Sequence, residues 1–256
     1  MRQPAIFFGH GSPMNALGGP YADVWRAVGE AVGKPKGVVM ISAHWETNGL
    51  GVTAQPHPET IHDFGGFPQA LFDAQYPAPG APEIAKETAK LSALIHEADD
   101  WGIDHGAWTI LMHLFPKADI PVFQLSIDYY QPMSYHLNLA KEIRALRDRG
   151  VLVIGSGNIV HNLRMSMSKL QNQDTSPFDW AVEFDNWVHE KIKNRDFQSL
   201  TDYEKAGTAG KLSVPTVDHY VPLLYTLGLA DEKEDIRQTY EEVTFGGISM
   251  RTFQVG

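Results

Sequence analysis

The feature that most constrains the fold of this chain is a set of four short apolar runs. They cover residues 4–9, 37–43, 121–127 and 151–156, and several end at Gly or Ser. Each run is too short for a typical helix, and apolarity that is nearly continuous is typical of strands covered on both faces, as in a parallel sheet. The runs therefore predict a buried sheet at the centre of the molecule.

Segments with helical periodicity separate these runs. Pro82 opens one, and its apolar residues keep one helical face as far as Ile95; residues 139–146 form another, which Gly150 ends as a C′ residue, and residues 180–188 form a third. Alternating strands and helices predict an α/β fold, with one mostly parallel or mixed sheet flanked by helices. No linker is visible, so we expect a single catalytic domain over residues 1–256.

Two further segments complete the prediction. The C-terminal "GGISMRTFQVG" is typical of a last strand, which we place at a sheet edge. Residues 55–80 are rich in Pro, Gly and aromatic residues, and they predict a long ordered loop. Long loops in compact domains are often functional.

Composition excludes several classes of function. The formal net charge of −10 disfavours nucleic acid as a partner, and the absence of cysteine excludes disulfides, thiolate metal sites and cysteine nucleophiles. No apolar run is long enough to span a membrane and the N-terminus does not resemble a signal peptide, so we expect a cytoplasmic protein. Any metal must bind through nitrogen and oxygen, and 11 histidines are available. No interface can be identified, so no particular oligomeric state is predicted.

Three histidines follow predicted strands. His10 follows the first strand in "FFGHGS", His44 the second in "ISAHWET", and His161 another in "GSGNIVHN". Ligand sites of open α/β sheets lie beyond the carboxyl ends of the strands, and imidazole suits Zn, Fe, Cu and Ni. A metal site there is therefore a reasonable hypothesis, although any single histidine can equally be a surface or core residue and no local metal motif is present.

Other histidines have weaker support. His105 precedes an apolar helix and is either a neighbour of the helix cap or a catalytic acid–base. His219 follows Asp218, which either caps the next helix, with His219 in its first turn, or orients the imidazole. His62 lies on the long loop, where a substrate contact is plausible. We expect the remaining histidines to be structural or surface residues.

Six motifs in this order resemble the class III extradiol ring-cleaving dioxygenases, and within them the DOPA 4,5-dioxygenase group. They are "FFGHGSPMNAL", "ISAHWET", "TIHDFGGFPQALFD", "DHGAWTILMHLFP", "GSGNIVHNLR" and "DHYVPLLYTLG". The resemblance runs from about residue 4 to the C-terminus. Each motif alone is weak, whereas the combination is specific.

The resemblance implies a non-haem Fe(II) enzyme that uses O₂ to open a small aromatic diol next to its hydroxyl groups. It implies metal ligands at His10, His44 and His219. His161 matches the catalytic acid–base, which in some relatives lies close enough to count as a fourth ligand, and His105 matches a second pocket histidine. Zn²⁺ can occupy such a site, although turnover requires Fe²⁺.

The substrate contacts are weaker predictions. Ser12, His62 and Asp63 are candidates for the polar tail of the substrate. Four aromatic residues are candidates for an aromatic wall or for the core: Trp45, Phe64, Phe67 and Tyr220. Gly9 and Gly11 are expected to leave room for a flat substrate beside His10, unless they simply form a tight turn.

Two alternatives compete with the dioxygenase. A zinc hydrolase is possible, because three histidines with one open position are a common catalytic zinc arrangement. A binding protein without catalysis is the other, although a storage site does not need spare acid–base histidines such as His161 and His105.

Overall fold

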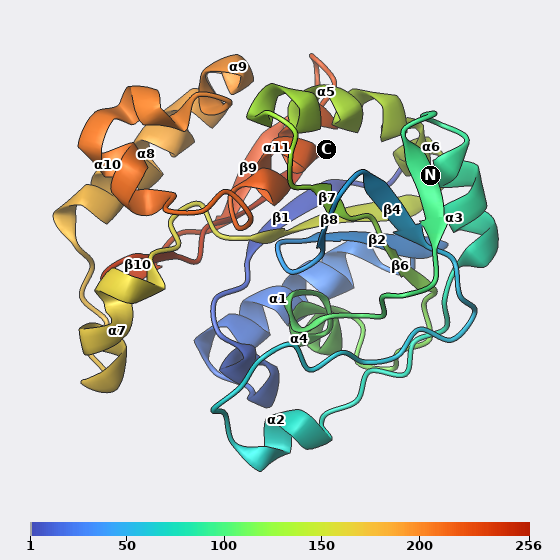
Figure 1. Cartoon of the computed structure of the whole chain (residues 1–256), viewed down its shortest axis with the longest axis horizontal. Helices are drawn as coiled ribbons and strands as arrows, with labels where there is room; N and C mark the ends of the chain where they lie inside the picture. Colours follow the sequence, from blue (N-terminus) through green and yellow to red (C-terminus); the bar gives the residue numbers. More distant parts are fainter. Residues whose placement is uncertain (1) are drawn as a thin grey trace.

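The computed structural model describes residues 2–256, and its centre is a mixed six-stranded sheet (Figure 1). The strand order is β6-β2-β8-β1-β12-β9. The first four strands are mutually parallel, and β12 and β9 extend the sheet in antiparallel pairing. The bounds are β1 Ala5–Gly9, β2 Gly37–Ser42, β6 Val122–Gln124, β8 Val151–Gly157, β9 Ile236–Tyr240 and β12 Thr252–Val255. The predicted α/β fold is confirmed.

Helices cover both faces of this sheet, because side chains alternate along each strand. Phe7, Val39 and Phe123 belong to one apolar cluster, with α5, α8 and α11. Phe8 and Met40 belong to the other, with α1 and α4. The bounds are α1 Pro20–Val32, α4 His105–Leu114, α5 Met133–Ile143, α8 Asp179–Lys193 and α11 Val221–Gly228. Burial on both faces explains why the strand sequences are apolar without alternation.

Smaller elements complete the chain. The helices are α2 Gln69–Asp73, α3 Pro82–Ala89, α6 Ala145–Asp148, α7 Leu163–Gln171, α9 Phe197–Leu200 and α10 Gly207–Ser213, with 3-10 turns η1 Pro13–Leu17 and η2 Tyr203–Ala206. Three two-stranded pairs are β3 Glu46–Thr47 with β7 Ile127–Asp128, β4 Leu50–Thr53 with β5 Ile95–Ala98, and β10 Val243–Thr244 with β11 Ile248–Ser249. No helix of the described part, residues 2–256, combines the length and apolarity needed to cross a bilayer.

Three local predictions are wrong. The helix from Pro82 ends at Ala89, and Ile95 belongs to strand β5, because residues 90–94 turn the chain into that strand. The run 121–127 is divided between β6 and β7. Strand β12 is internal, because the chain pairs β9 on its outer side. The C′ position of Gly150 fits its φ of 87°.

The segment 55–80 is ordered and mostly irregular, as predicted, with only α2 as a helix inside it. It runs along the lower side of the molecule in Figure 1, away from α8 and α10. Its first half continues from strand β4, and its main chain bridges to Ile103 just before α4. This brings residues 62–67 beside the start of α4.

Candidate metal centre

The sheet topology brings the predicted histidines together beyond the carboxyl ends of neighbouring strands. His10 follows β1 directly, His44 lies two residues beyond β2, and His161 lies four residues beyond β8. These three strands are adjacent and parallel, and their last residues are in register. The three histidines therefore leave the sheet together, as the sequence predicts.

Two more histidines join them. The ring centres of His10 and His44 lie 5.1 Å apart, and that of His105 lies 3.9 Å from His44. The His219 ring lies 5.2 Å from His10 and 5.1 Å from His44, and His161 stacks on it at 3.5 Å. Five of the 11 histidines form one cluster, in which His10, His105 and His219 are buried and His44 and His161 are half-buried.

Three nitrogen atoms of this cluster converge most closely. Ligand atoms of His10, His44 and His105 all lie within 4.8 Å of one another, which defines a three-histidine metal site. The Nε2 atoms of His10 and His44 are 3.3 Å apart. Two nitrogens bound tetrahedrally at about 2.0–2.1 Å from a metal lie about 3.3–3.4 Å apart, so this pair fits one ion. The prediction had named His219, rather than His105, as the third ligand.

The tautomer of His10 is set by its neighbour Ser156. The Ser156 hydroxyl donates to the Gly106 carbonyl at 2.6 Å, so its oxygen must accept from His10 Nδ1, which lies 3.0 Å away. The proton is therefore on Nδ1, and His10 Nε2 keeps the lone pair that a metal needs.

Carboxylates lie beside three other rings. Asp63 Oδ2 lies 2.9 Å from His105 Nδ1 and 3.5 Å from His44 Nδ1, and Asp63 Oδ1 accepts the main-chain N–H of His105 at 3.0 Å. Asp218 contacts His219 Nδ1. Because an ionised carboxylate only accepts, His219 Nδ1 carries the proton, and its Nε2 lone pair is left for a ligand. This is the outer-partner pattern of metal-binding histidines.

Burial lowers the pKa of four histidines of the cluster. Desolvation, followed by repulsion from neighbouring histidines, holds the pKa of His10 and His219 well below the usual range, and burial also lowers the pKa of His44. Burial lowers the pKa of His161 to about 4. Burial would raise the pKa of Asp63, but its hydrogen bonds with His105 outweigh this and the pKa falls. Neutral imidazoles beside ionised carboxylates suit a cation.

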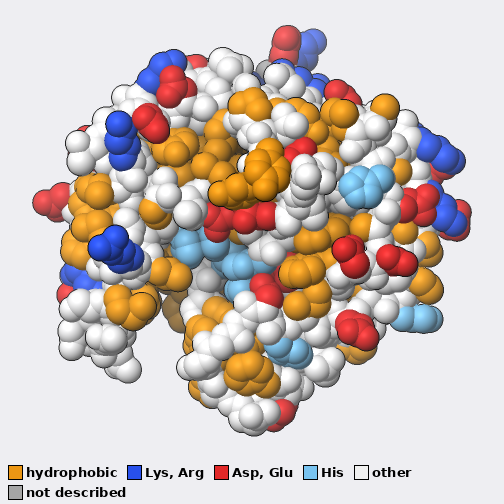
Figure 2. Space-filling view, viewed as in Figure 1, with side chains coloured by type: hydrophobic (Ala, Val, Ile, Leu, Met, Phe, Trp, Pro, Cys, Tyr) orange, Lys and Arg blue, Asp and Glu red, His pale blue; other side chains and the backbone are white. Residues whose placement is uncertain are grey.

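The cluster forms the floor of a cavity of about 450 Å³. Phe64 and Phe67 line one side, and Leu163, Met167 and Leu170 of α7 also line it. Figure 2 shows histidine side chains in a hollow at the centre of the face, with hydrophobic side chains on either side. The cavity therefore has a nitrogen-rich floor and apolar walls.

The predicted substrate contacts are distributed unevenly. Ser12 lines the cavity, and its Oγ also accepts the N–H of Met14 at the start of η1. His62 Nε2 donates to Ala74 O at 2.9 Å, and Asp63 binds His105; neither is among the cavity-lining residues. Their roles as substrate contacts stay predictions.

The candidates for an aromatic wall separate into two groups. Phe64 and Phe67 line the cavity. Trp45 is buried and stacks on Trp101, and the hydroxyl of buried Tyr220 donates to Leu200 O, so both belong to the core.

The glycines beside His10 allow the chain to pack closely against Met250. A Cβ on Gly9 would lie 2.7 Å from the main chain of Met250, and one on Gly11 would lie 2.7 Å from Met250 Sδ. Gly11 also has a φ of 64°, which glycine adopts without strain. Both glycines permit close packing against Met250, although Gly11 also lines the cavity.

The structure also corrects the helix after His219. Helix α11 begins at Val221 with Tyr220 as its N-cap, so His219 precedes the helix and Asp218 does not cap it. Asp218 instead orients the imidazole, which was the other interpretation of this pair.

Sequence reasoning missed several supporting residues. Asp104 caps α4 by accepting from Ala107 and also accepts from the Ser42 hydroxyl at 2.7 Å. A Cβ on Gly106 would lie 2.6 Å from Ser42 Oγ and 2.7 Å from the His44 ring. In the motif "DHG", Asp104 is therefore the N-cap of α4, His105 contributes a ring to the cluster, and Gly106 allows Ser42 and His44 to approach closely. The sequence alone indicates only the first of these roles, because Asp is a preferred N-cap residue.

The fold and the cluster define an α/β protein with a metal site of neutral histidines at the carboxyl ends of parallel strands. Residues 5–252 match the family described as the catalytic LigB subunit of aromatic ring-opening dioxygenases. The chain belongs to this family of class III extradiol ring-cleaving dioxygenases.

Individual relatives agree with this family assignment. The chain is 43% identical to a 4,5-DOPA dioxygenase extradiol from Escherichia coli K12, covering 100% of this chain and 95% of the relative. It is 35% identical to a protein of the same name from Beta vulgaris, over 89% of this chain and 87% of the relative. A crystal structure of an uncharacterized E. coli K12 protein, 38% identical, superposes with a TM-score of 0.86 over the full length of both chains. The protein is thus an aromatic ring-cleaving dioxygenase.

Proposed function

We propose that this protein is an Fe(II)-dependent extradiol dioxygenase that opens the ring of a DOPA-type catechol with O₂. One observation carries the proposal: four histidines converge on one site with Ser156, Asp63 or Asp218 beside their Nδ1 atoms, and the Nε2 atoms of His10 and His44 lie 3.3 Å apart. Neutral nitrogen donors of this kind suit iron and zinc. The relatives named 4,5-DOPA dioxygenase support the catechol.

His10 and His44 are the proposed core of the iron site, with His219 as the third ligand and His161 beside it. Asp218 supports the choice of His219, because a carboxylate on Nδ1 raises the basicity of a metal-binding imidazole. His105 has the same support from Asp63 and is the competing third ligand. Fe²⁺, when bound, would supply a Lewis acid that makes catechol hydroxyls more acidic and a site at which catechol and O₂ meet.

His161 is the proposed acid–base. Its pKa of about 4 leaves the ring neutral near pH 7, and a neutral imidazole can accept a proton from a catechol hydroxyl. Stacking on His219 holds the ring at the cavity floor, and the cavity gives substrate access to it. His161 would return this proton as the ring opens.

His105 is the proposed hydrogen-bonding partner of the substrate. Asp63 fixes both its main-chain N–H and its Nδ1, so the ring is held in one orientation. Its Nε2 is then the polar atom left to meet a catechol oxygen. Ser12 is the remaining polar side chain predicted for the substrate, and it lines the same cavity.

The test is turnover under defined metal loading. The protein is loaded anaerobically with Fe²⁺ or Zn²⁺, L-DOPA and oxygen are added, and O₂ uptake and ring-opened product are followed. We expect one O₂ consumed per product with Fe²⁺ and none with Zn²⁺. The absence of O₂ uptake with every catechol tested contradicts the proposal, and hydrolysis with Zn²⁺ would favour the hydrolase instead.

Metal content decides the third ligand. We expect His219→Ala to lose most of its bound Fe²⁺ in equilibrium dialysis, whereas His105→Ala keeps it but turns over slowly. The opposite result would assign His105 as the ligand. His113→Ala is a control, because His113 lies outside the cluster and contacts Asn15 O.

A further inference from the structure

The cavity above the histidines has no charged side chain that could meet the charged end of a DOPA-type substrate. Among its lining residues in the described chain, residues 2–256, none is Asp, Glu, Lys or Arg. Its walls are apolar and come from Phe64, Phe67 and three residues of α7. A catechol ring fits between such walls, whereas an ammonium and a carboxylate placed there would lose hydration without gaining opposite charges.

A second hollow of about 630 Å³, which we call the depression, adjoins the cavity. His161 and Leu163 line both hollows, so a ligand beside the proposed acid–base can extend from one into the other. Helices α7 and α10, which lie on the same side of the molecule in Figure 1, supply the cations of the depression, Arg164 and Lys211. Asp218 also lines the depression and has the opposite charge. Both charges of an amino acid therefore have a counterpart there.

The two cations differ in how far they are already paired. Lys211 Nζ lies 3.4 Å from a carboxylate oxygen of Glu204, and both side chains are mostly exposed. Arg164 forms neither an ion pair nor a side-chain hydrogen bond with any other residue that the structure describes. A guanidinium can bind one carboxylate through two parallel N–H groups. Arg164 is therefore the cation that is free to bind the carboxylate of a ligand.

Only one oxygen of the Asp218 carboxylate is used within the protein. Its Oδ2 contacts His219 Nδ1, whereas its Oδ1 accepts no hydrogen bond from the residues in the range 2–256. The side chain is 20% exposed and lines the depression. Because a carboxylate has two acceptor oxygens, an ammonium can donate to Oδ1 while Oδ2 keeps its contact with His219.

From these observations we propose that the depression binds the amino-acid end of the substrate. Arg164 is the specificity-determining partner of the α-carboxylate, and Asp218 Oδ1 is the partner of the α-ammonium. The catechol ring then lies over the histidines, between the apolar walls. The inference rests on the proposed function, because the histidines must hold the diol for the side chain of the substrate to reach the depression.

Three catechols separate the two charges. L-DOPA carries both, 3-(3,4-dihydroxyphenyl)propionate carries only the carboxylate, and dopamine carries only the ammonium. In the Fe²⁺-loaded enzyme, Arg164→Gln is expected to lower kcat/KM for L-DOPA and for the propionate by about tenfold, mostly through KM, because charge-assisted hydrogen bonds are lost. The value for dopamine, measured in the same way by O₂ uptake, should stay close to that of wild type.

Two further variants are the controls. Arg164→Lys keeps the charge but lacks the planar pair of donors, so it should restore part of the lost kcat/KM for the two carboxylates. Arg26→Gln removes the same charge from an exposed position on α1 that pairs with Asp23 and lines neither hollow, so it should change no substrate. A purely structural role of Arg164 would lower the values for all three catechols together and would overturn the inference.

Anaerobic binding separates the inference from the proposed function. The dissociation constants of the three catechols are measured by calorimetry without O₂, for Fe²⁺-loaded wild type and Arg164→Gln. If catechols bind but none is opened when O₂ is added, the proposed function is wrong, and a loss of affinity confined to the two carboxylates still supports the depression. If Arg164→Gln weakens dopamine as much as L-DOPA, or weakens neither, the inference is wrong. If no catechol binds, both are wrong.

Discussion

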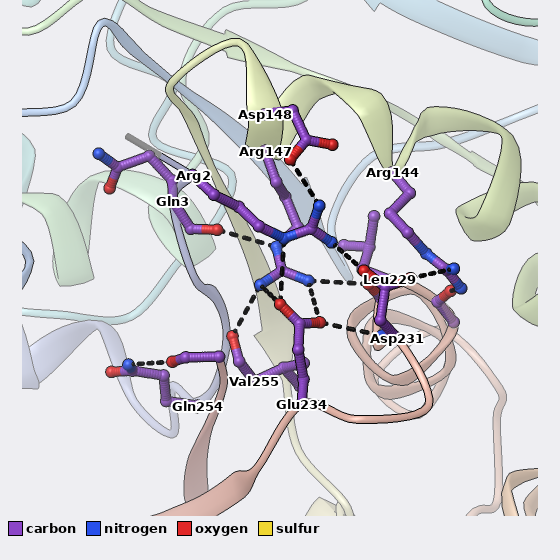
Figure 3. A network of polar contacts seen from close by, with 12 residues as sticks. Arg2, Gln3, Arg144, Arg147, Asp148, Leu229, Asp231, Glu234, Gln254 and Val255 are labelled. Carbon is purple, nitrogen blue, oxygen red and sulfur yellow. Dashed lines mark hydrogen bonds and ion pairs between the residues drawn. The ribbon is translucent and has the colours of Figure 1, made fainter.

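Two polar clusters lie at opposite ends of the strands of the central sheet, and they differ in how completely their polar groups are hydrogen-bonded. The histidine cluster follows the carboxyl ends of β1, β2 and β8. The second cluster surrounds Arg147, near the amino ends of β1 and β8, and Figure 3 shows its contacts. We call it the Arg147 network.

Arg147, at the centre of this network, is fully paired. Its guanidinium is 1% exposed, and all five of its N–H groups are used: they donate to Glu234 and to the carbonyls of Gln3, Leu229 and Val255. Arg2 adds a contact to Glu234, and the network thereby joins both ends of the chain to the segment before β8. No N–H of Arg147 is left over to bind a ligand.

The histidine cluster is paired on one side only. Ser156, Asp63 or Asp218 lies beside each Nδ1 of His10, His44, His105 and His219, whereas the Nε2 atoms of His10 and His44 face each other 3.3 Å apart. Buried polar groups without partners are costly, so such an arrangement persists where it has a function. The difference teaches that satisfaction of hydrogen bonds, rather than burial, separates a structural polar cluster from a binding one.

The largest expected effect is on chemistry without loss of the metal. His161→Ala should lower kcat by about 10²–10⁴-fold, because it removes the proposed acid–base. Bound Fe²⁺ and the free energy of unfolding should change little, since His161 has no outer carboxylate partner. Steady-state O₂ uptake and metal analysis check this, and full activity in the variant would refute the assignment.

The next effect breaks the Arg147 network. Arg147→Met should lower the free energy of unfolding by about 3–5 kcal/mol, because it leaves the Glu234 carboxylate without its buried partner. Urea unfolding measures this, with Arg149→Met as a control, since Arg149 is 47% exposed and 3.6 Å from Glu87. The folded Arg147→Met variant should still bind Fe²⁺. Equal destabilisation by both substitutions would contradict the role given to the network.

A smaller effect concerns the outer partner of two histidines. Asp63→Asn should weaken Fe²⁺ binding by about 10–100-fold, because an amide does not orient His105 and His44 as a carboxylate does. Equilibrium dialysis measures the affinity. Asp73→Asn on α2 is the matched control and should leave it unchanged, because Asp73 is exposed and bonds Gln69. Unchanged affinity in Asp63→Asn would leave Asp63 without this role.

The smallest expected effect is a decrease in the free energy of unfolding at acid pH. Burial would raise the pKa of Glu234, but the hydrogen bond from Arg147 outweighs this and lowers the pKa from 4.5 to about 2. The stabilisation is therefore complete above pH 4.5 and is lost as pH falls toward 2. Urea unfolding at several pH values should show a steeper decline for wild type than for Glu234→Gln in this window. Parallel curves would place the acid limb elsewhere.

Much of the site could be predicted from sequence because strand ends are local features. His10, His44 and His161 follow recognisable apolar runs, and parallel neighbours must end at one edge. Asp63 and Ser156 could not be assigned as orienting partners, because their contacts join segments far apart in the chain. The close packing of the glycines beside His10 could not be predicted for the same reason, since Met250 comes from the other end of the sequence.

In the fold, too, local features could be predicted from the sequence and long-range pairing could not. Apolar runs defined the buried strands, whereas the internal position of β12 depends on its pairing with β9, which no local pattern specifies. The helix from Pro82 ends at Ala89, before the predicted Ile95, because Ile95 belongs to strand β5 and pairs with β4. Tertiary pairing overrides local periodicity at both places.

Oxygen labelling tests the central claim most directly. The Fe²⁺-loaded protein is given L-DOPA under ¹⁸O₂, and the ring-opened product is analysed by mass spectrometry. Extradiol cleavage predicts one labelled oxygen in the new carboxylate and one in the new aldehyde before exchange with water. A ring-opened product without label in its carboxylate, or labelling that persists in a His10→Ala variant that binds no iron, would contradict the account.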